Sequence, residues 1–323
     1  MAITHTIDEA YVETPTAVRL APRPMRALWR GIGIALAPAY VRIAEHQGAR
    51  GIEFHKRASW LAMKWLVANR APYARRWLFN LIGNPIVLTR YQEFDYAWRN
   101  LPTQIERYID ISSPSIFPLR VIHEHPVARA TLLNPDLSDL QLTRQLIKAA
   151  AFESRCATSP ALITDFDSPD AAFDLITSIS VIEHIPENKP AIERIWRLLK
   201  PGGVLIITVP CSAHGYALYT NADHYGLLDT DSCGRVFLEY LYDESMLKNF
   251  IFSITGLPKT MEVYGEVRAG FLRSELQRRW SGHYVRFWKE PELMRREFRQ
   301  FGAIADLPGE GVAGMTFVKD ISK

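Results

Sequence analysis

Apolar and polar residues follow one another in the middle of the chain in blocks that have the lengths of strands and helices. Residues 173–178 and 204–209 are two apolar runs rich in Ile, Leu and Val, as expected of strands buried on both faces of a parallel sheet. Between them, apolar side chains recur at helical spacing, at Ile192, Ile195, Trp196 and Leu199. Pro190 suits the first turn of this helix, and Gly202 with Gly203 suits its end. The pattern predicts strand, helix and strand in the order of a parallel α/β sheet.

The same criteria predict the rest of an α/β core that begins near Leu101. Further strands are expected at 108–111, 130–134 and 161–165, and a helix is expected at 140–150. Asp243 precedes a short helical segment and is a predicted N-cap. Two more strands are expected at 261–264 and 315–318.

The first hundred residues contain no comparable strand pattern. Residues 1–24 are polar and contain several prolines, so we expect a mobile arm. From 25 to 100 the pattern is helical, with apolar runs that end before Gly83. The predicted organisation is therefore an arm, a helical N-terminal extension over 25–100, and an α/β domain over 101–323 that carries insertions at 211–242 and 268–310.

Charge is spread unevenly along a chain whose net charge is only +3. Residues 1–100 hold 14 Lys and Arg against 7 Asp and Glu, so the remainder is net negative. A basic segment could face nucleic acid, anionic lipid or an acidic substrate, but a solvated helical surface is the simpler interpretation. The Trp and Leu residues of these helices suit a core better than a membrane surface, so peripheral membrane contact is considered but not favoured.

The cysteines and the hydropathy of the chain indicate the cellular compartment in which the protein is expected. The three cysteines are odd in number and lack CxxC spacing, which favours neither a disulfide framework nor a zinc site. No apolar run has membrane-spanning length, and the first 20 residues lack the apolar core of a signal peptide. A cytoplasmic location is predicted.

The residues Phe173-Asp174-Leu175-Ile176-Thr177-Ser178, then Glu183-His184, then Leu199-Lys200-Pro201-Gly202-Gly203 closely resemble the fourth and fifth strands of class I S-adenosylmethionine-dependent methyltransferases of the type 11-like group. The resemblance implies a Rossmann-like mixed sheet of seven strands, the last one antiparallel, with helices on both faces. It also implies S-adenosyl-L-methionine as cofactor. The implied enzyme transfers a methyl group to an oxygen or nitrogen of a small or lipid/glycan-linked acceptor.

The loop after the first strand departs from the family pattern, which is usually Asp-x-Gly-x-Gly-x-Gly. Asp110 stands where the family has its acid, but Ser112, Pro114 and Ile116 fill the three glycine positions. Ser112 and Ser113 are expected to hydrogen-bond the carboxylate or ammonium of the cofactor. Because Pro114 removes a backbone donor and fixes φ, the loop cannot follow the usual path. The alternative is a tight turn that binds no ligand.

Other cofactor contacts are implied by position in the family pattern. Asn134 stands in place of the acid that accepts both ribose hydroxyls, and Asp136 is an alternative acceptor nearby. Asp165 and Phe166 match the acid and the apolar neighbour beside the adenine ring. The residues implied to lie near the sulfonium are Ser178 and Ile179.

Candidate catalytic residues are two histidines. His184 follows the fourth strand, where the methyl group would point, and can act as a general base because histidine titrates near neutrality. A capping or packing role for Glu183 or His184 is the alternative. His224 is the second candidate, in a predicted substrate-lining segment that also contains His214 and Asp223. No spacing there places the side chains on one face, so no metal is predicted.

In the insertion 268–310, aromatic and basic residues alternate. This pattern is found in proteins that bind single-stranded nucleic acid. No RNA-binding motif accompanies it, so nucleic acid is not favoured and a small-molecule acceptor is the predicted partner. The oligomeric state is left open by the sequence. A second functional hypothesis is a methyltransferase-like protein that has lost catalysis and serves as a binding or scaffold protein, and the loop 112–116 separates the two.

Overall fold

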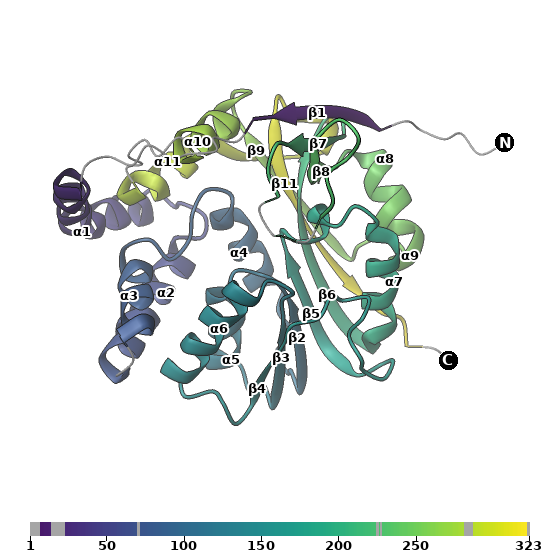
Figure 1. The fold of residues 1–323 in the computed structure, drawn as a ribbon, viewed down its shortest axis with the longest axis horizontal. Helices are drawn as coiled ribbons and strands as arrows, with labels where there is room; N and C mark the ends of the chain where they lie inside the picture. The colour runs from purple at the N-terminus through teal and green to yellow at the C-terminus, as the bar shows by residue number, and fades with distance from the viewer. Residues whose placement is uncertain are drawn as a thin grey trace.

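The computed structural model describes residues 7–13, 23–69, 72–223, 226, 228–280 and 287–321. A sheet of eight strands runs through the molecule with helices on both faces (Figure 1). Its order is β10-β9-β11-β6-β5-β2-β3-β4. The bounds are β2 Arg107–Ile111, β3 Arg129–Leu133, β4 Cys156–Ser159, β5 Phe173–Ile179, β6 Leu199–Ser212, β9 Thr260–Glu266, β10 Phe298–Phe301 and β11 Glu310–Val318.

Strand direction follows the predicted α/β pattern. Strands β2 to β6 are parallel, while β11 is antiparallel to both β6 and β9. The fold class and the antiparallel last strand are therefore confirmed. The predicted count of seven strands is one too low, because β10 forms an additional edge strand inside the segment that was expected to be an insertion.

The predicted third strand was placed too late in the chain. Residues 161–165 contain no strand, and the third parallel strand is β4, which pairs only with β3 at the edge of the sheet. An edge strand needs no continuous apolar run, so the short sequence Cys156-Ala-Thr-Ser was not recognised. In the apolar run 161–165, Ile163 is buried but Leu162 is 47% exposed.

The helices cover the sheet in two layers, each with its own apolar core. One layer contains α5 (Ile116–Glu124) and α6 (Leu137–Ala149), and the other contains α7 (Asn188–Leu198), α8 (Glu244–Leu247) and α9 (Ser253–Thr255) (Figure 1). Asp243 caps α8 as predicted, since its carboxylate accepts a hydrogen bond from Met246 N at 2.8 Å.

The N-terminal extension is helical, as predicted, and packs on the layer of α5 and α6. It consists of α1 (Arg23–His46), which continues through Pro38, α2 (Ile52–Ala68), α3 (Pro72–Gly83) and α4 (Arg90–Arg99). Phe54, Phe94 and Phe117 join α2, α4 and α5 through ring centroids 4.8–5.7 Å apart. Aromatic rings in such numbers bury much apolar area, so this cluster anchors the extension to the domain.

Helix α4 also approaches the sheet closely, which places its first turns at the carboxyl ends of the strands. The hydroxyl of Tyr96 donates to Thr260 O at 2.8 Å, and its ring lies over Gly314 of β11. A Cβ on Gly314 would lie 2.4 Å from that ring, so only glycine permits this approach.

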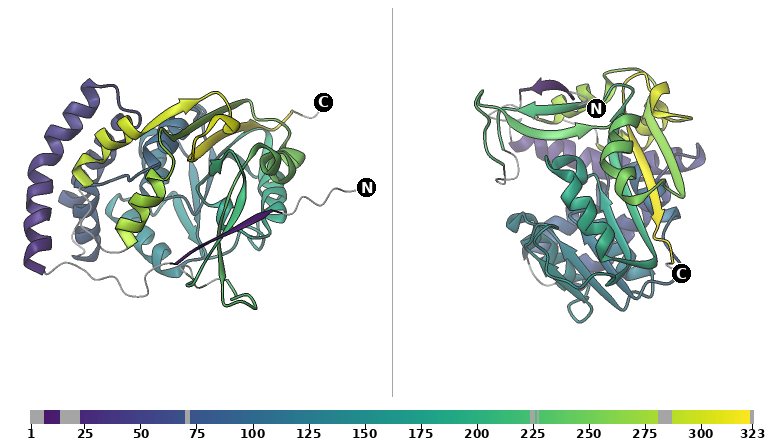
Figure 2. Two further views of the ribbon diagram at one scale, coloured as in Figure 1. Left: turned by 90° about the horizontal axis from the view of Figure 1, so that it is seen from above. Right: turned by 90° about the vertical axis from the view of Figure 1, so that its right-hand side faces the viewer.

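The N-terminal arm is partly structured, contrary to the prediction. Asp8–Val12 form strand β1, which pairs in parallel with β7 (Tyr216–Thr220), and β7 pairs antiparallel with β8 (Val236–Leu241). The prediction failed because five residues with one buried side chain, Val12, give no apolar pattern, and only the partner strand fixes them. This three-stranded sheet lies across one end of the large sheet (Figure 2).

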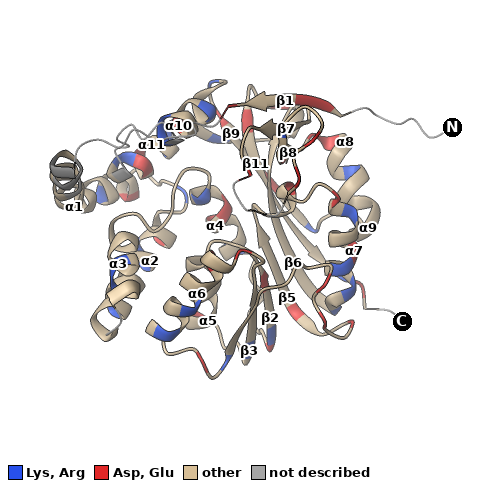
Figure 3. Cartoon of the chain, in the orientation of Figure 1, with Lys and Arg blue, Asp and Glu red and all other residues tan. Residues whose placement is uncertain are grey.

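The insertion 268–310 lies beside the N-terminal helices. It contains α10 (Phe271–Trp280) and α11 (Glu290–Glu297), and α11 contacts α1. Helices α2, α3, α10 and α11 contain several Lys and Arg positions, whereas β1 contains acidic ones (Figure 3). Among the described helices, none has the length and apolar character needed to cross a membrane.

Candidate active site

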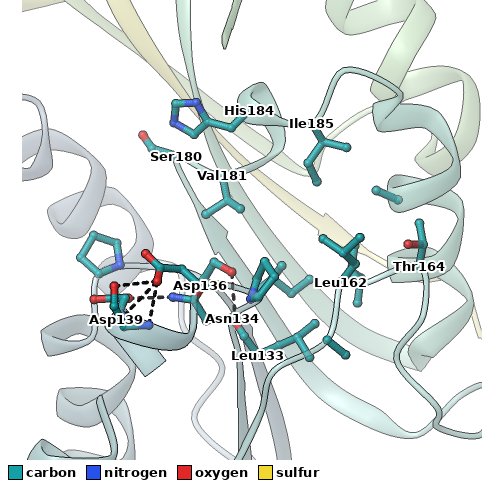
Figure 4. A pocket seen from close by; sticks show the side chains of 18 of the residues that line it. Leu133, Asn134, Asp136, Asp139, Leu162, Thr164, Ser180, Val181, His184 and Ile185 are labelled. Atoms are coloured by element: carbon teal, nitrogen blue, oxygen red, sulfur yellow. Dashed lines mark hydrogen bonds between the residues drawn. The ribbon is translucent and has the colours of Figure 1, made fainter. Parts of the chain in front are cut away.

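A pocket of about 800 Å³ opens at the carboxyl ends of the parallel strands. Ligands bind at this edge of an open α/β sheet, and the volume is in the usual range for small-molecule sites. The loops after β2, β3, β4 and β5 each contribute to the lining, and α4 adds Arg90 (Figure 4). The pocket therefore lies where the family pattern requires a cofactor.

The loop after β2 presents one of its two serines to the pocket. Ser112 lines the pocket with a φ of +53°, and its hydroxyl donates to Leu133 O at 3.1 Å. Ser113 is buried, and its hydroxyl accepts a hydrogen bond from Ile179 N at 3.0 Å. The expected cofactor contact of Ser113 is therefore not supported, because that side chain fastens the loop to β5.

Asp110 also faces the interior rather than the pocket. Its carboxylate accepts hydrogen bonds from Ser113 N at 3.0 Å and from the Thr177 hydroxyl at 2.5 Å, with Tyr108 OH at 3.3 Å. Burial raises its pKa from 3.8 to about 6, although these hydrogen bonds oppose the rise. Asp110 thus organises the loop from behind, and Ile116 is buried in α5 and points away from the pocket.

The raised pKa of Asp110 predicts a pH dependence of stability. The folded protein binds this proton more tightly than the unfolded chain, so the stabilisation is complete below pH 3.8 and is lost as the pH rises to 6. The loss amounts to about 3 kcal/mol. The free energy of unfolding is measured by urea denaturation of the parent and of Asp110→Asn at pH 4 and at pH 7. The variant should lack the pH-dependent contribution of Asp110. Between these two pH values the free-energy difference between parent and variant should change by most of that amount, and an unchanged difference would show that Asp110 has an ordinary pKa.

The loop after β3 carries two carboxylates at the pocket. Asn134 lines the pocket, but its amide donates to Asp139 Oδ2 at 2.7 Å and its oxygen accepts from Asp136 N at 3.0 Å. Asp136 caps α6 through Ser138 N and Asp139 N. Burial and the charge of Asp136 raise the pKa of Asp139. The acceptors available to a ligand here are therefore Asp136 and Asp139, and Asn134 positions them (Figure 4).

The segment after β4 gives the pocket an apolar wall made by Ala161, Leu162, Ile163 and Thr164. Asp165 and Phe166, the predicted adenine contacts, are absent from the lining. The side chain of Asp165 is exposed, and Phe166 packs on Phe173 with ring centroids 6.4 Å apart. Their placement is corrected because the strand ends at Ser159, six residues before Asp165.

The end of β5 contributes residues just beyond those predicted. Ser178 and Ile179 are fully buried and do not line the pocket, whereas Ser180 and Val181 do. Ser180, with a φ of +49°, donates a short hydrogen bond to the carboxylate of Glu93, which also accepts from Thr208 at 3.2 Å. The buried Glu93 pairs with Arg90 at 2.6 Å. This network joins α4 to the strand ends.

His184 lies at the pocket, as predicted, at the end opposite Asp139 (Figure 4). Its Nδ1 is 2.7 Å from Leu238 O on β8, which requires the proton on Nδ1 and makes Nε2 the acceptor nitrogen of the neutral ring. Glu183 is buried beside it, with Oε1 4.0 Å from Nε2. Burial raises the pKa of Glu183 well above its usual range. The other catalytic candidate, His224, lies outside the described residues.

The comparison with protein families identifies the domain. Residues 110–207 match the family model described as a methyltransferase domain. Residues 110–207 form a methyltransferase domain of this family. This confirms the class I methyltransferase assignment made from the sequence, and S-adenosyl-L-methionine is the cofactor of this domain.

Individual relatives of the methyltransferase domain are distant. Phosphoethanolamine N-methyltransferase 3 of Arabidopsis thaliana is 28% identical over 114 residues, which are 34% of this chain and 23% of the relative. The chain thus matches about a quarter of that protein. Similar solved structures include a putative sarcosine dimethylglycine methyltransferase from Galdieria sulphuraria, with a TM-score of 0.46, 13% identity and coverage of 78% and 91% of the two chains. Phosphoethanolamine N-methyltransferase 2 of Haemonchus contortus in complex with S-adenosyl-L-methionine has a TM-score of 0.46, 15% identity and coverage of 71% and 52%.

The donors and acceptors of the pocket fit this cofactor. Two carboxylates at one end suit hydroxyl groups, and the wall with Leu162 suits a flat ring. Asp139 and Val181 were missed by sequence reasoning, although the short distance of Asp139 from the predicted Asn134 was an available signal. Glu93 could not be found in this way, because it lies in a different part of the chain.

Proposed function

We propose that the protein transfers a methyl group from S-adenosyl-L-methionine to an oxygen or nitrogen of a small or lipid/glycan-linked acceptor. The observation that carries the proposal is a single pocket with ribose-type acceptors at one end and His184 at the other. The curated relative is named for N-methylation of phosphoethanolamine, which supports a small amine among the possible acceptors.

The cofactor would be held by groups from all four loops. Asp136 and Asp139 would accept hydrogen bonds from its hydroxyls, and Leu162 and Ile185 would offer apolar contact to its ring. The hydroxyl of Ser112 would be available to its methionine portion. When bound, the cofactor supplies a methyl group on a sulfonium, so the protein mainly has to align the acceptor.

His184 is proposed to receive the proton that the acceptor loses. The carbonyl of Leu238 holds the imidazole proton on Nδ1, so Nε2 is the atom that accepts. Strand β8 packs against the turn containing His184 and so holds the imidazole at this end of the pocket.

Affinity for the cofactor tests the proposal. Asp139→Asn should weaken binding of S-adenosyl-L-methionine by about 1–3 kcal/mol, since a carboxylate acceptor is lost while the contact with Asn134 can persist. Isothermal titration calorimetry with the cofactor and with S-adenosylhomocysteine measures this. Asp165→Ala is the matched control, because that carboxylate is exposed and away from the pocket.

Absence of binding to the parent protein would favour the second hypothesis, a binding or scaffold protein without catalysis. That hypothesis is motivated by the loop after β2, in which Ser113 and Asp110 are occupied by internal hydrogen bonds. Equal affinity of parent and Asp139→Asn would remove Asp139 from the site without affecting the rest of the proposal.

A further inference from the structure

We propose that Glu183, His184 and Glu239 bind a single divalent cation at the edge of the pocket. The sequence predicted no metal, because neither the cysteines nor the histidines of 211–242 have the spacing of metal ligands, and Glu239 on β8 lies far along the chain from Glu183 and His184. The fold brings them together, since β8 packs against the turn that carries Glu183 and His184.

The donor atoms are already close to coordinating distance. One atom from each of the three side chains lies within 4.8 Å of both others. First-row cations bind nitrogen and oxygen at about 2.0–2.2 Å, so two of three donors on one ion lie about 3.3–3.8 Å apart in tetrahedral or trigonal geometry. Closing the site therefore needs a shift of about 1 Å in the side chains, and Glu239, which is only half-buried, can supply it.

A buried oxygen without a partner points independently to a ligand. Glu183 is 1% exposed, and its Oε2 has no hydrogen-bond partner within the described parts of the chain. Neither Glu183 nor Glu239 forms an ion pair with Lys or Arg among the described residues. Two other carboxylates near the site do, Glu93 with Arg90 and Glu310 with Arg273. A buried carboxylate oxygen normally has a hydrogen-bond donor, a counter-charge or a metal beside it, and a bound cation would be the partner that Oε2 of Glu183 lacks among the described residues.

The histidine has the orientation of a metal ligand. Because Nδ1 bonds to the carbonyl of Leu238, Nε2 faces Glu183, and a backbone carbonyl is a usual outer partner of coordinating histidine. Leu238 and Glu239 are consecutive, so one strand supplies both the outer partner and a ligand. One imidazole with two carboxylates suits Zn²⁺ or Mn²⁺, and three protein ligands leave positions open to the pocket.

The cation site and the proposed methyl transfer share His184. A coordinated Nε2 has no lone pair left for a proton, so a bound cation and the base role of His184 exclude each other. We therefore expect cation loading to lower the rate of methyl transfer to acceptors that must lose a proton.

Binding is tested on the untagged full chain after treatment with a chelator, by calorimetric titration with ZnCl₂ alone and with MnCl₂ alone. We expect one saturable site for at least one of these ions. Glu239→Gln and Glu183→Gln should each weaken binding at least about tenfold. Glu187→Gln is the matched control, an exposed carboxylate on the same segment, and should bind like the parent.

The outcomes separate this inference from the proposed function. No saturable binding of either ion, or equal binding by the parent and Glu239→Gln, overturns the cation site even where S-adenosyl-L-methionine binds. Glu239→Gln keeps the test decisive if Glu183→Gln does not fold, as circular dichroism would show. Cation binding without cofactor binding supports the site and contradicts the proposed function.

Discussion

Replacing His184 by glutamine is expected to slow methyl transfer by about 10²–10⁴-fold, the usual effect of losing a general base. Glutamine keeps a hydrogen-bonding group of similar size at the pocket but cannot take a proton. The hydrogen bond to Leu238 O can still form, so the turn after β5 should keep its position. The loss should therefore appear in kcat rather than in cofactor affinity.

The measurement is release of S-adenosylhomocysteine with a panel of small amine and hydroxyl acceptors, with the variant and the parent assayed after chelation. His46→Gln is the control, because His46 is exposed at the end of α1. A His184→Gln variant that turns over an acceptor at the parental rate would show that His184 packs the turn and takes no part in the chemistry.

Replacing Phe117 by alanine is expected to lower the free energy of unfolding by about 3–5 kcal/mol. Phe117 is fully buried in α5 and contacts the rings of Phe54, Phe94 and Trp98. The substitution removes its buried area and leaves a cavity between rigid elements, which cannot collapse easily. Because the ring joins α5 to α2 and α4, the N-terminal extension should lose its attachment first.

Urea unfolding followed by circular dichroism measures the change, and limited proteolysis of the 23–99 segment shows whether the extension is released. Phe79→Ala on α3 is the matched control, since that ring is 53% exposed and should change stability by less than about 0.5 kcal/mol. A Phe117→Ala variant as stable as the control would mean that the extension is held elsewhere, through Tyr96 for example.

Much of the fold could be predicted because its signals are local. The apolar runs at 173–178 and 204–209 gave β5 and β6, and the helix between them became α7. Elements whose formation depends on a partner were not predictable. Strand β4 is short and only part-apolar, and β1 forms only by pairing with β7.

The same division holds for the candidate site. Ser112, Asn134 and His184 follow strands directly and were found by position. Ser113 and Asp110 were expected at the cofactor, but their direction depends on hydrogen bonds with Thr177 and Ile179, which lie more than sixty positions away. No local pattern reports such a contact.

The sequence by itself determined the parallel α/β order, the helical extension and the methyltransferase family, because hydrophobic periodicity and short motifs are properties of neighbouring residues. Only the tertiary structure decided which polar groups face the pocket and which form hydrogen bonds within the protein interior. It also brought Glu239 to His184 and Glu93 to Ser180. These pairings depend on how distant elements pack. Leaving a polar group unpaired becomes costly only where it is buried, and burial arises only when the fold has formed.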